Sequence, residues 1–379
     1  MAEWQIVRLG NIIKTNQSTY STKENWQFVN YLDTGNITMN RIEEIQYINT
    51  DIDKLPSRAR RKVKYGSIIY STVRPNQLHY GIVKEQPDNF LVSTGFTVID
   101  VDKEKAVPEY IYYLLTQHNV TERLQAIAEQ SVSAYPSLKS SDIEDLFISL
   151  PDINTQNKIV YVLSVIDEKI TQNTKINNNL EQQADALYQS FFSPKSGTQG
   201  KLVTLDEYCS IFTGKKNANA SVDGGKYKFF TCAPEALQID SYIYDGNAII
   251  VSGNGAYTGR TRFYSGKFDL YQRTYACTLL DNVNPEFIFP LYWFVKLELS
   301  KKIMGGTRGS AIPYIVMNDL AKFEFIYNEQ TFTEYMPIFK SLTEAIQANE
   351  FENENLAQIR DSLLPKLMSG ELDVSDIKL

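Results

Sequence analysis

Two long stretches of this sequence place apolar residues at the spacing of a helix that packs along another helix. The spacings alternate between four and three residues, which is a heptad pattern. The first apolar stripe is Ile159, Leu163, Ile166, Ile170, Leu180, Ala184, Leu187 and Phe191. The second is Tyr335, Phe339, Leu342, Ile346, Leu356, Leu363 and Leu367, with Arg360 in one position. Each stripe is interrupted near its middle by two asparagines, Asn173 and Asn177 in the first and, at a constant offset in the numbering, Asn349 and Asn353 in the second.

This shared interruption predicts that the two helices pair antiparallel about a pseudo-two-fold axis, so that the asparagine layers meet. Buried asparagines reduce stability but fix the register, because a slipped pairing leaves amides among apolar groups. The alternative is two unrelated amphipathic surface helices, which would not reproduce the polar interruption. The residues expected at the helix pairing are Ile159, Leu163, Ile166, Ile170, Asn173, Asn177, Leu180, Leu342, Ile346, Asn349, Asn353 and Leu356.

The bulk composition indicates a folded protein with more than one domain. A chain of 379 residues is too long for one core, and its 43% hydrophobic content argues against disorder. There is no signal-peptide pattern and no apolar run long enough for a membrane span. The three cysteines lack pair spacing and there are only two histidines. We therefore expect a cytoplasmic protein without a disulfide framework or a metal site.

The formal charge of −7 is unevenly distributed, which matters for nucleic-acid binding. Residues 328–379 contain 4 basic and 10 acidic residues, whereas residues 1–150 contain 16 and 18. The parts outside the last helix are thus near neutral and can carry local basic surfaces.

The second half of the chain repeats the plan of the first. Ala248–Ser252 matches the predicted strand Ser67–Ser71, and Pro285 matches Pro108, where a helix is expected to begin. The offset between matched positions falls from 196 at the start to 181, and then stays at 177 and 176. Insertions are therefore confined to early loops, which indicates two similar scaffolds with different binding loops.

Two segments of the first half carry side chains suited to DNA. The run Arg58, Arg60, Arg61, Lys62 and Lys64 predicts a phosphate-binding patch, although a charge run is more often a solvated face. The loop after the predicted strand at 67–71 has side chains that can form paired hydrogen bonds with base edges, or it is an ordinary turn. The candidates here and in the later polar loop are Arg74, Asn76, Gln77, His79, Tyr80, Ser133 and Tyr135.

The second half has matching candidates. The glycine-rich loop at 252–262 hints at a nucleotide site, but we expect a strand at Arg262–Tyr264 and a turn at Ser265–Gly266, where a nucleotide-binding motif would have a helix. The DNA-binding candidates are Lys215, Lys216, Asn217, Asn254, Tyr257, Arg260, Arg262, Arg308 and Ser310.

Catalytic signatures are absent from the sequence. There is no phosphate-loop lysine motif and no methyltransferase motif of the Asn-Pro-Pro-Tyr type. A nuclease-like pattern matches formally at Asp152, Asp167 and Lys169, but Asp167 and Lys169 are two residues apart on a helix and point to different faces. We therefore expect no catalytic centre and no bound metal.

The chain resembles the specificity subunits of Type I restriction–modification enzymes over nearly its whole length. The resemblance rests on the duplicated plan, on the segment Leu150–Gln156 that leads into the first helix, and on the ending from Leu356 to Leu372. The Arg-Pro-Asn-Gln core of the loop in Ser71–Gly81 resembles one type of target-recognition domain. The second copy departs from the family pattern at Tyr327–Gln330, so the resemblance does not fix the start of the second helix.

The resemblance implies an α+β fold with two mixed α/β target-recognition domains, arranged by internal duplication and separated by a long antiparallel two-helix coiled coil. The expected boundaries are a recognition domain at 1–152, a spacer helix at 153–193, a linker at 194–200, a second recognition domain at 201–328, and a C-terminal spacer helix with a tail at 329–379.

The resemblance further implies a non-catalytic subunit that reads an asymmetric, split site on double-stranded DNA. Its partners would be two methyltransferase subunits docked on the helices, together with restriction subunits. The chain would bind no cofactor, because S-adenosylmethionine, ATP and magnesium would be held by the partners. Two other hypotheses remain, an assembly adaptor that does not bind DNA and a self-contained nuclease.

Overall fold

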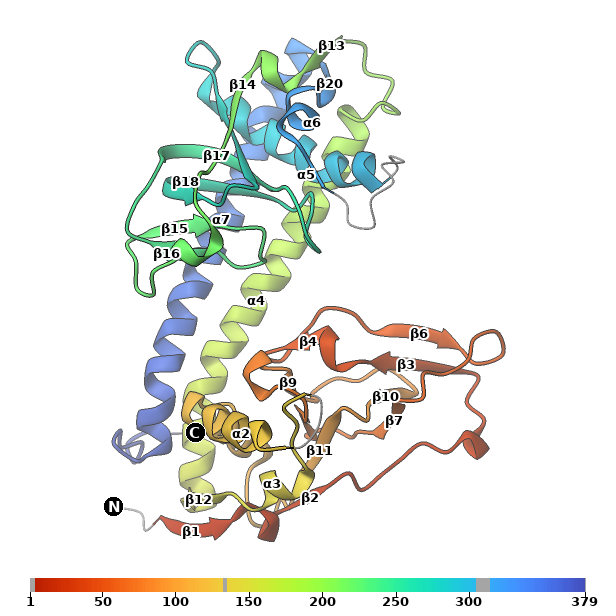
Figure 1. The fold of residues 1–379 in the computed structure, drawn as a ribbon, viewed down its shortest axis with the longest axis vertical. Helices are drawn as coiled ribbons and strands as arrows, with labels where there is room; N and C mark the ends of the chain where they lie inside the picture. The colour runs from red at the N-terminus through yellow and green to blue at the C-terminus, as the bar shows by residue number, and fades with distance from the viewer. Residues whose placement is uncertain (1–3, 132–134, 305–313, 379) are drawn as a thin grey trace. The chain divides into compact units, whose positions relative to one another are not determined.

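The computed structural model describes residues 4–131, 135–304 and 314–378, which form two compact units. The first unit comprises residues 1–169 and 355–379, and the second comprises residues 170–354. Two long helices contribute to both units, α4 (Ile153–Phe191) with 39 residues and α7 (Glu329–Met368) with 40 (Figure 1). The two expected long helices are therefore present, whereas their spacer role and the expected domain boundaries remain predictions.

The first unit contains small sheets covered by short helices. A four-stranded sheet has the order β6-β3-β10-β7, a second has the order β2-β11-β8-β9, and β1 pairs with β12. Its strands are β1 (Gln5–Arg8), β2 (Ile13–Thr15), β3 (Phe28–Leu32), β4 (Ile37–Thr38), β5 (Arg41–Ile42), β6 (Gln46–Asn49), β7 (Ala59–Lys62), β8 (Ile68–Ser71), β9 (Tyr80–Ile82), β10 (Phe90–Ser93), β11 (Phe96–Val101) and β12 (Phe147–Leu150). Its short helices are α1 (Pro108–Leu115), α2 (His118–Glu129) and α3 (Ser140–Glu144).

The helix α1 anchors the largest core of the first unit. Pro108 occupies its first turn, where the missing N–H costs no helical hydrogen bond. Every residue from Tyr110 to Leu115 is buried, so that α1 lies inside the unit rather than on its surface. It packs in one cluster with Ile159 and Leu163 of α4 and with Leu367 of α7.

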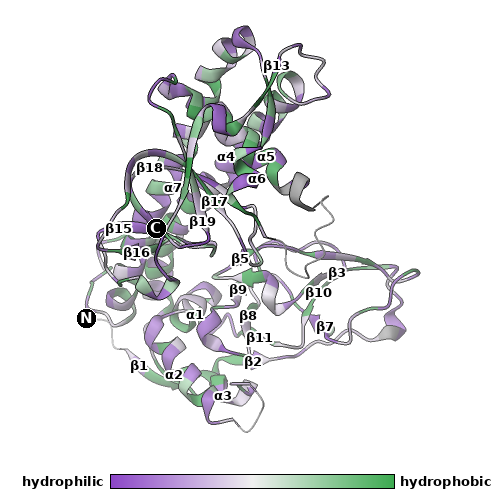
Figure 2. Ribbon diagram, turned by 45° about the horizontal axis from the view of Figure 1, so that its top comes forward, coloured by the Kyte–Doolittle hydropathy of each residue, from purple (hydrophilic) through white to green (hydrophobic). Residues whose placement is uncertain are grey.

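The second unit is built on one six-stranded sheet with the order β14-β19-β17-β18-β15-β16. Its strands are β13 (Lys201–Thr204), β14 (Cys209–Thr213), β15 (Tyr227–Phe230), β16 (Leu237–Ile239), β17 (Tyr244–Ser252), β18 (Thr261–Leu270), β19 (Thr274–Leu279) and β20 (Glu324–Tyr327). Its shorter helices are α5 (Ile288–Met304) and α6 (Met317–Ala321). Hydrophobic and hydrophilic residues interleave along the helices of both units, as expected for helices with one buried side (Figure 2).

The two units share a framework, as the repeat predicted. In each, the first strand pairs antiparallel with the strand that precedes a long helix, β1 with β12 and β13 with β20. One local expectation was wrong, because Ser265 and Gly266 form no turn and lie within β18. Gly266 faces Gly246 across the β17–β18 pair, and both have positive φ values. Two opposed glycines let the strands continue with a local distortion that a side chain would resist.

Equivalent side chains start the two long helices. The Thr155 N–H donates to Oδ1 of Asp152 at 3.0 Å, and the Thr331 N–H donates to Oδ1 of Asn328 at 2.9 Å. Asp152 and Asn328 are related by the same offset as the asparagine pairs, and both residue types are favoured helix caps. The second helix therefore begins at Glu329, although its preceding segment departs from the family pattern.

Candidate functional site

Both units hold the loop that follows a buried strand in the same way. After β8, the Leu138 N–H donates to the Thr72 carbonyl at 2.7 Å. After β17, the Ile315 N–H donates to the Gly253 carbonyl at 2.8 Å. These residues are related by the offsets 181 and 177 of the sequence repeat. The duplicated framework thus presents two equivalent loops, each fixed at its base by a segment from later in its own unit.

The loop of the first unit exposes a stacked arginine. Arg74 has a left-handed backbone conformation with φ 48°, which is uncommon for a residue with a side chain. Its N–H donates to the Pro136 carbonyl at 3.0 Å, which helps to hold this conformation. Its guanidinium carbon lies 4.9 Å from the centre of the Tyr135 ring. Asn76 and Gln77 are also exposed, so this loop presents polar side chains to solvent.

Two residues next to this loop serve the unit's interior instead. Tyr80 is only 4% exposed and stacks on Tyr70, with 5.7 Å between ring centres. Burial raises its pKa well above the usual range. Tyr80 therefore belongs to the core of the unit, and its contact with DNA stays an untested prediction. His79 is half-buried, and its Nδ1 atom lies 2.6 Å from the Ile37 carbonyl oxygen, a partner that the sequence does not reveal.

The loop of the second unit also exposes an arginine beside a tyrosine. The Arg260 guanidinium carbon lies 5.6 Å from the centre of the Tyr257 ring, and both residues are exposed. The Gly259 N–H donates to the Ser252 carbonyl at 2.8 Å and closes the loop. The next element is the strand β18, as predicted, where a dinucleotide-binding motif would have a helix. Asn254 is half-buried and forms a bridge with Tyr314.

Two other cations of the second unit have internal partners. The Lys216 ammonium lies 2.8 Å from Oδ2 of Asp269, which is 1% exposed, and it also donates to Ser241. The Arg262 guanidinium donates to the Ala233 carbonyl, and burial lowers its pKa. Both charges therefore have a role within the unit, and their contact with DNA stays a prediction. Lys215 and Asn217 are exposed beside them.

The basic run of the first unit does not form a single patch. It lies largely on β7, where successive side chains point to opposite faces of the sheet. Arg58 is exposed and Arg60 is half-buried, whereas Arg61 falls on the face shared with buried Ala59. Lys62 pairs with Glu24, and this hydrogen bond lowers the pKa of the Glu24 carboxyl. The alternation of the strand thus divides the cations between two faces.

The asparagine layers lie within the second unit. Asn173 donates to Oδ1 of Asn353 at 2.9 Å and to Oε2 of Glu352 at 2.7 Å. Asn349 donates to Oδ1 of Asn177 at 2.7 Å. Residue numbers rise along α4 while those of the partners fall along α7, so the helices are antiparallel there. Adding the repeat offset of 176 to Asn173 gives Asn349, and subtracting it from Asn353 gives Asn177. The first asparagine pair is thereby converted into the second, as a pseudo-two-fold axis requires.

The eight apolar residues predicted at the helix pairing are buried to different degrees. Four are buried, Ile159 and Leu163 in the first unit and Leu342 and Ile346 in the second. Four are half-buried, namely Ile166, Ile170, Leu180 and Leu356. Three other expected DNA contacts, Ser133, Arg308 and Ser310, lie outside the described residues.

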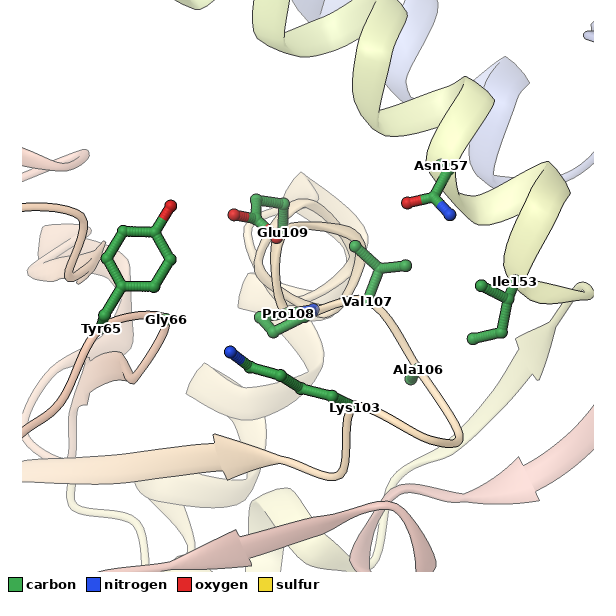
Figure 3. A pocket seen from close by; sticks show the side chains of 9 residues that line it. All are labelled: Tyr65, Gly66, Lys103, Ala106, Val107, Pro108, Glu109, Ile153 and Asn157. Atoms are coloured by element: carbon green, nitrogen blue, oxygen red, sulfur yellow. The ribbon is translucent and has the colours of Figure 1, made fainter. Parts of the chain in front are cut away.

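A cavity in the first unit offers no catalytic arrangement. It has a volume of about 270 Å³ and lies where α1 and α4 begin (Figure 3). Figure 3 shows Lys103 extending toward Tyr65 along one side, and the ammonium lies 5.9 Å from the ring centre. Glu109 is the acidic residue of its described lining. Among residues 4–131, 135–304 and 314–378, no three His, Cys, Asp or Glu side chains form a group that could hold a metal ion. Within the same ranges no helix has the length and apolar content needed to cross a membrane.

Comparison with known proteins shows the family. Residues 1–182 and 200–360 each match the Type I restriction modification DNA specificity domain, so the chain belongs to this family. The resemblance seen in the sequence is therefore confirmed.

Curated relatives carry the same family name. The Type I restriction enzyme HindI specificity subunit of Haemophilus influenzae is 30% identical over 226 residues, which cover 59% of this chain and 48% of that protein. The Type I restriction enzyme EcoDI specificity subunit of Escherichia coli is 36% identical over 177 residues, which cover 45% and 38%. The matched part spans less than half of each relative.

A solved structure shares the fold. The S subunit of a Type I restriction-modification system from M. genitalium superposes with a TM-score of 0.59 at 16% identity, covering 97% of this chain and 96% of that one. The prediction of duplicated, mixed α/β halves with long helices is therefore confirmed.

Proposed function

We propose that this chain is the DNA-recognition subunit of a Type I restriction–modification complex and has no catalytic activity of its own. The observation that carries the proposal is the pair of equivalent loops on a duplicated framework, each with an exposed arginine beside a tyrosine. Arginine is the side chain most often used to read guanine in the major groove, since its planar fork matches two acceptors. The family membership and the curated relatives support the same function.

The two loops differ, and this difference supports an asymmetric target. The first loop presents Asn76 and Gln77 next to Arg74, whereas the second presents glycines around Tyr257. Side chains that differ in this way form different hydrogen bonds with base edges. Each loop would then read its own half of a split site.

The long helices suit a spacer between the half-sites. A helix of 39 residues is about 58 Å long at the usual rise per residue. That length corresponds to somewhat more than one and a half turns of B-DNA. We propose that methyltransferase subunits dock along these helices and that restriction subunits join the complex. S-adenosylmethionine, ATP and magnesium would be bound by those partners.

The test is to map methylated bases in a host that carries the chain and its partner methyltransferase. Arg74→Ala should relax base choice in one half of the methylated site, and Arg260→Ala should relax it in the other. Lys54→Ala removes an exposed positive charge outside both loops and is the control, because it should leave the motif unchanged. An unaltered motif in both arginine variants would contradict base reading by these loops. Without salt-dependent DNA binding in the presence of the methyltransferase, the adaptor hypothesis would stand instead.

A further inference from the structure

Each unit joins its buried shorter helix to a long helix by an aromatic hydrogen bond whose acceptor lies at an equivalent position of the long helix. In the first unit, the Tyr113 hydroxyl of α1 donates to Oδ2 of Asp167 on α4 at 2.6 Å. In the second, the Trp293 indole of α5 donates to Oγ1 of Thr343 on α7 at 2.9 Å. Asp167 and Thr343 occupy matching positions of the repeat, related by the offset that also relates the asparagine layers. The framework has kept the position of the acceptor and changed its chemistry, whereas the donors come from different positions of the shorter helices.

The joint of the first unit is charged and connects three helices. Nη1 of Arg360, on α7, lies 2.9 Å from Oδ1 of Asp167, so that α1, α4 and α7 meet at one carboxylate. Nη2 of the same arginine lies 2.8 Å from Asp361. Arg360 is the charged residue that interrupts the apolar stripe of α7, and its equivalent in the other stripe is buried Ala184. A planar guanidinium with directed donors restrains angle as well as distance.

The joint of the second unit is closed and uncharged. Trp293 is 0% exposed and Thr343 is 2% exposed. The Thr343 hydroxyl donates in turn to the Phe339 carbonyl of its own helix at 2.7 Å. Packing therefore fixes this joint on every side. In the first unit the side chains of Arg360 and Asp167 are 19% and 32% exposed, and they border a cavity of about 60 Å³.

A continuous row of rings connects the charged joint to the DNA-reading loop. Tyr80 begins β9, directly after that loop, and also borders the cavity. Its ring centre lies 6.3 Å from that of Tyr112, which lies 5.3 Å from that of Tyr113. Tyr113 ends the row at Asp167. The orientation of the loop is thus tied to the geometry of the Asp167 carboxylate.

We propose that Tyr113, Asp167 and Arg360 are positioning residues that set the angle of the first recognition loop relative to the long helices, and thereby the spacing at which its half-site is accepted. The inference rests on the proposed function. In the second unit the equivalent joint carries no such adjustable contact, because its donor and acceptor are both enclosed by packing.

The experiment compares methylation at sites with the native spacer and at sites with one base pair more or less. Arg360→Leu should raise the relative methylation of the altered spacers by about threefold or more, since the carboxylate no longer holds α7 at a fixed angle. Tyr113→Phe retains the ring and should change the ratio in the same direction by less. Thr343→Val removes the acceptor of the second unit and is the matched control, for which we expect an unchanged ratio.

A purely structural role predicts a different result, a lower total methylation with an unchanged ratio between spacers. The double variant Asp167→Leu with Arg360→Leu separates the two, because it removes the unpaired charge and should recover thermal stability without recovering spacer selectivity. An unchanged ratio in folded Arg360→Leu and Tyr113→Phe overturns the inference. Should Arg360→Leu not fold, Tyr113→Phe and the double variant decide the question. If the native chain directs no methylation of a split site, the proposed function itself fails.

Discussion

The two units have the same framework but stabilise it by different means. At equivalent positions, the first unit uses Asp167 with Arg360 where the second uses Thr343 with Ala184. The first also uses Gln156, fully buried, whose Oε1 accepts from the Val107 N–H at 2.8 Å. Its counterpart in the second unit is Phe332, which is 1% exposed and packs among aromatic rings. Polar contacts depend on direction whereas apolar packing depends on volume, so the two units should respond differently to the same kind of substitution.

The largest effect is expected from Trp293→Ala. Deleting a fully buried tryptophan leaves a cavity, and we expect the free energy of unfolding of the second unit to fall by about 3–5 kcal/mol. All three cysteines lie in the second unit, and Cys209 and Cys277 are buried. Burial raises the pKa of the Cys209 thiol to about 12, so it should resist alkylation until the unit opens. Labelling of Cys209 and Cys277 therefore measures the opening of this unit alone.

The contrasting variant is Arg360→Leu in the first unit. Since the Asp167 carboxylate is partly exposed, water compensates some of its lost partner, and a destabilisation of about 1–2 kcal/mol is expected. It should not accelerate labelling of Cys209 or Cys277, whereas Trp293→Ala should. If both variants accelerated cysteine labelling equally, the two units would open together. The proposed difference in how the two units are stabilised would then be contradicted.

The sequence contained the repeated pattern but not the partners of individual polar residues. Heptad spacing is local, so the long helices and the positions of their asparagines could be predicted directly. Arg360 could be recognised in the sequence as a charged residue within an apolar stripe. Its partner Asp167 is 193 residues away, and the sequence singled it out only as part of a chance match to a nuclease pattern. The internal partners of Lys216 and Arg262 could not be predicted for the same reason, because they come from other strands and loops. Burial of Tyr80 likewise depends on Tyr112, which belongs to a helix later in the chain.

A smaller effect is expected at the asparagine layers, where polar contacts occur inside the second unit. Asn177→Ala leaves the Asn349 amide without its acceptor, and the free energy of unfolding should fall by about 1–2 kcal/mol. The double variant Asn177→Leu with Asn349→Leu should be nearly neutral in stability, because both members of the pair become apolar. It should nevertheless weaken the register of α4 on α7, since slipped pairings no longer bury an amide. Cysteine cross-linking at matched and shifted positions of the two helices measures this register, and retention of a single register would contradict the assigned role.

The smallest effect is expected at the N-terminal caps of the two long helices, Asp152 for α4 and Asn328 for α7, which differ in having a carboxylate or an amide. The Thr155 N–H lowers the pKa of the Asp152 carboxyl, so this cap stabilises the folded state above the unfolded carboxyl's pKa of about 4 and loses that contribution as the pH falls through the lower, folded value. Asn328 does not titrate, so the equivalent cap of α7 should be independent of pH. Asp152→Asn should therefore cost only a few tenths of a kcal/mol at neutral pH, where the helix dipole favours a negative charge, and less at acidic pH, as the carboxyl becomes protonated. Asn328→Asp should produce the opposite change. Unfolding of the four combinations of Asp and Asn at the two caps, at neutral and at acidic pH, measures the difference. If the protein with asparagine at both caps has the same acid dependence as the native protein, other carboxylates cause that dependence.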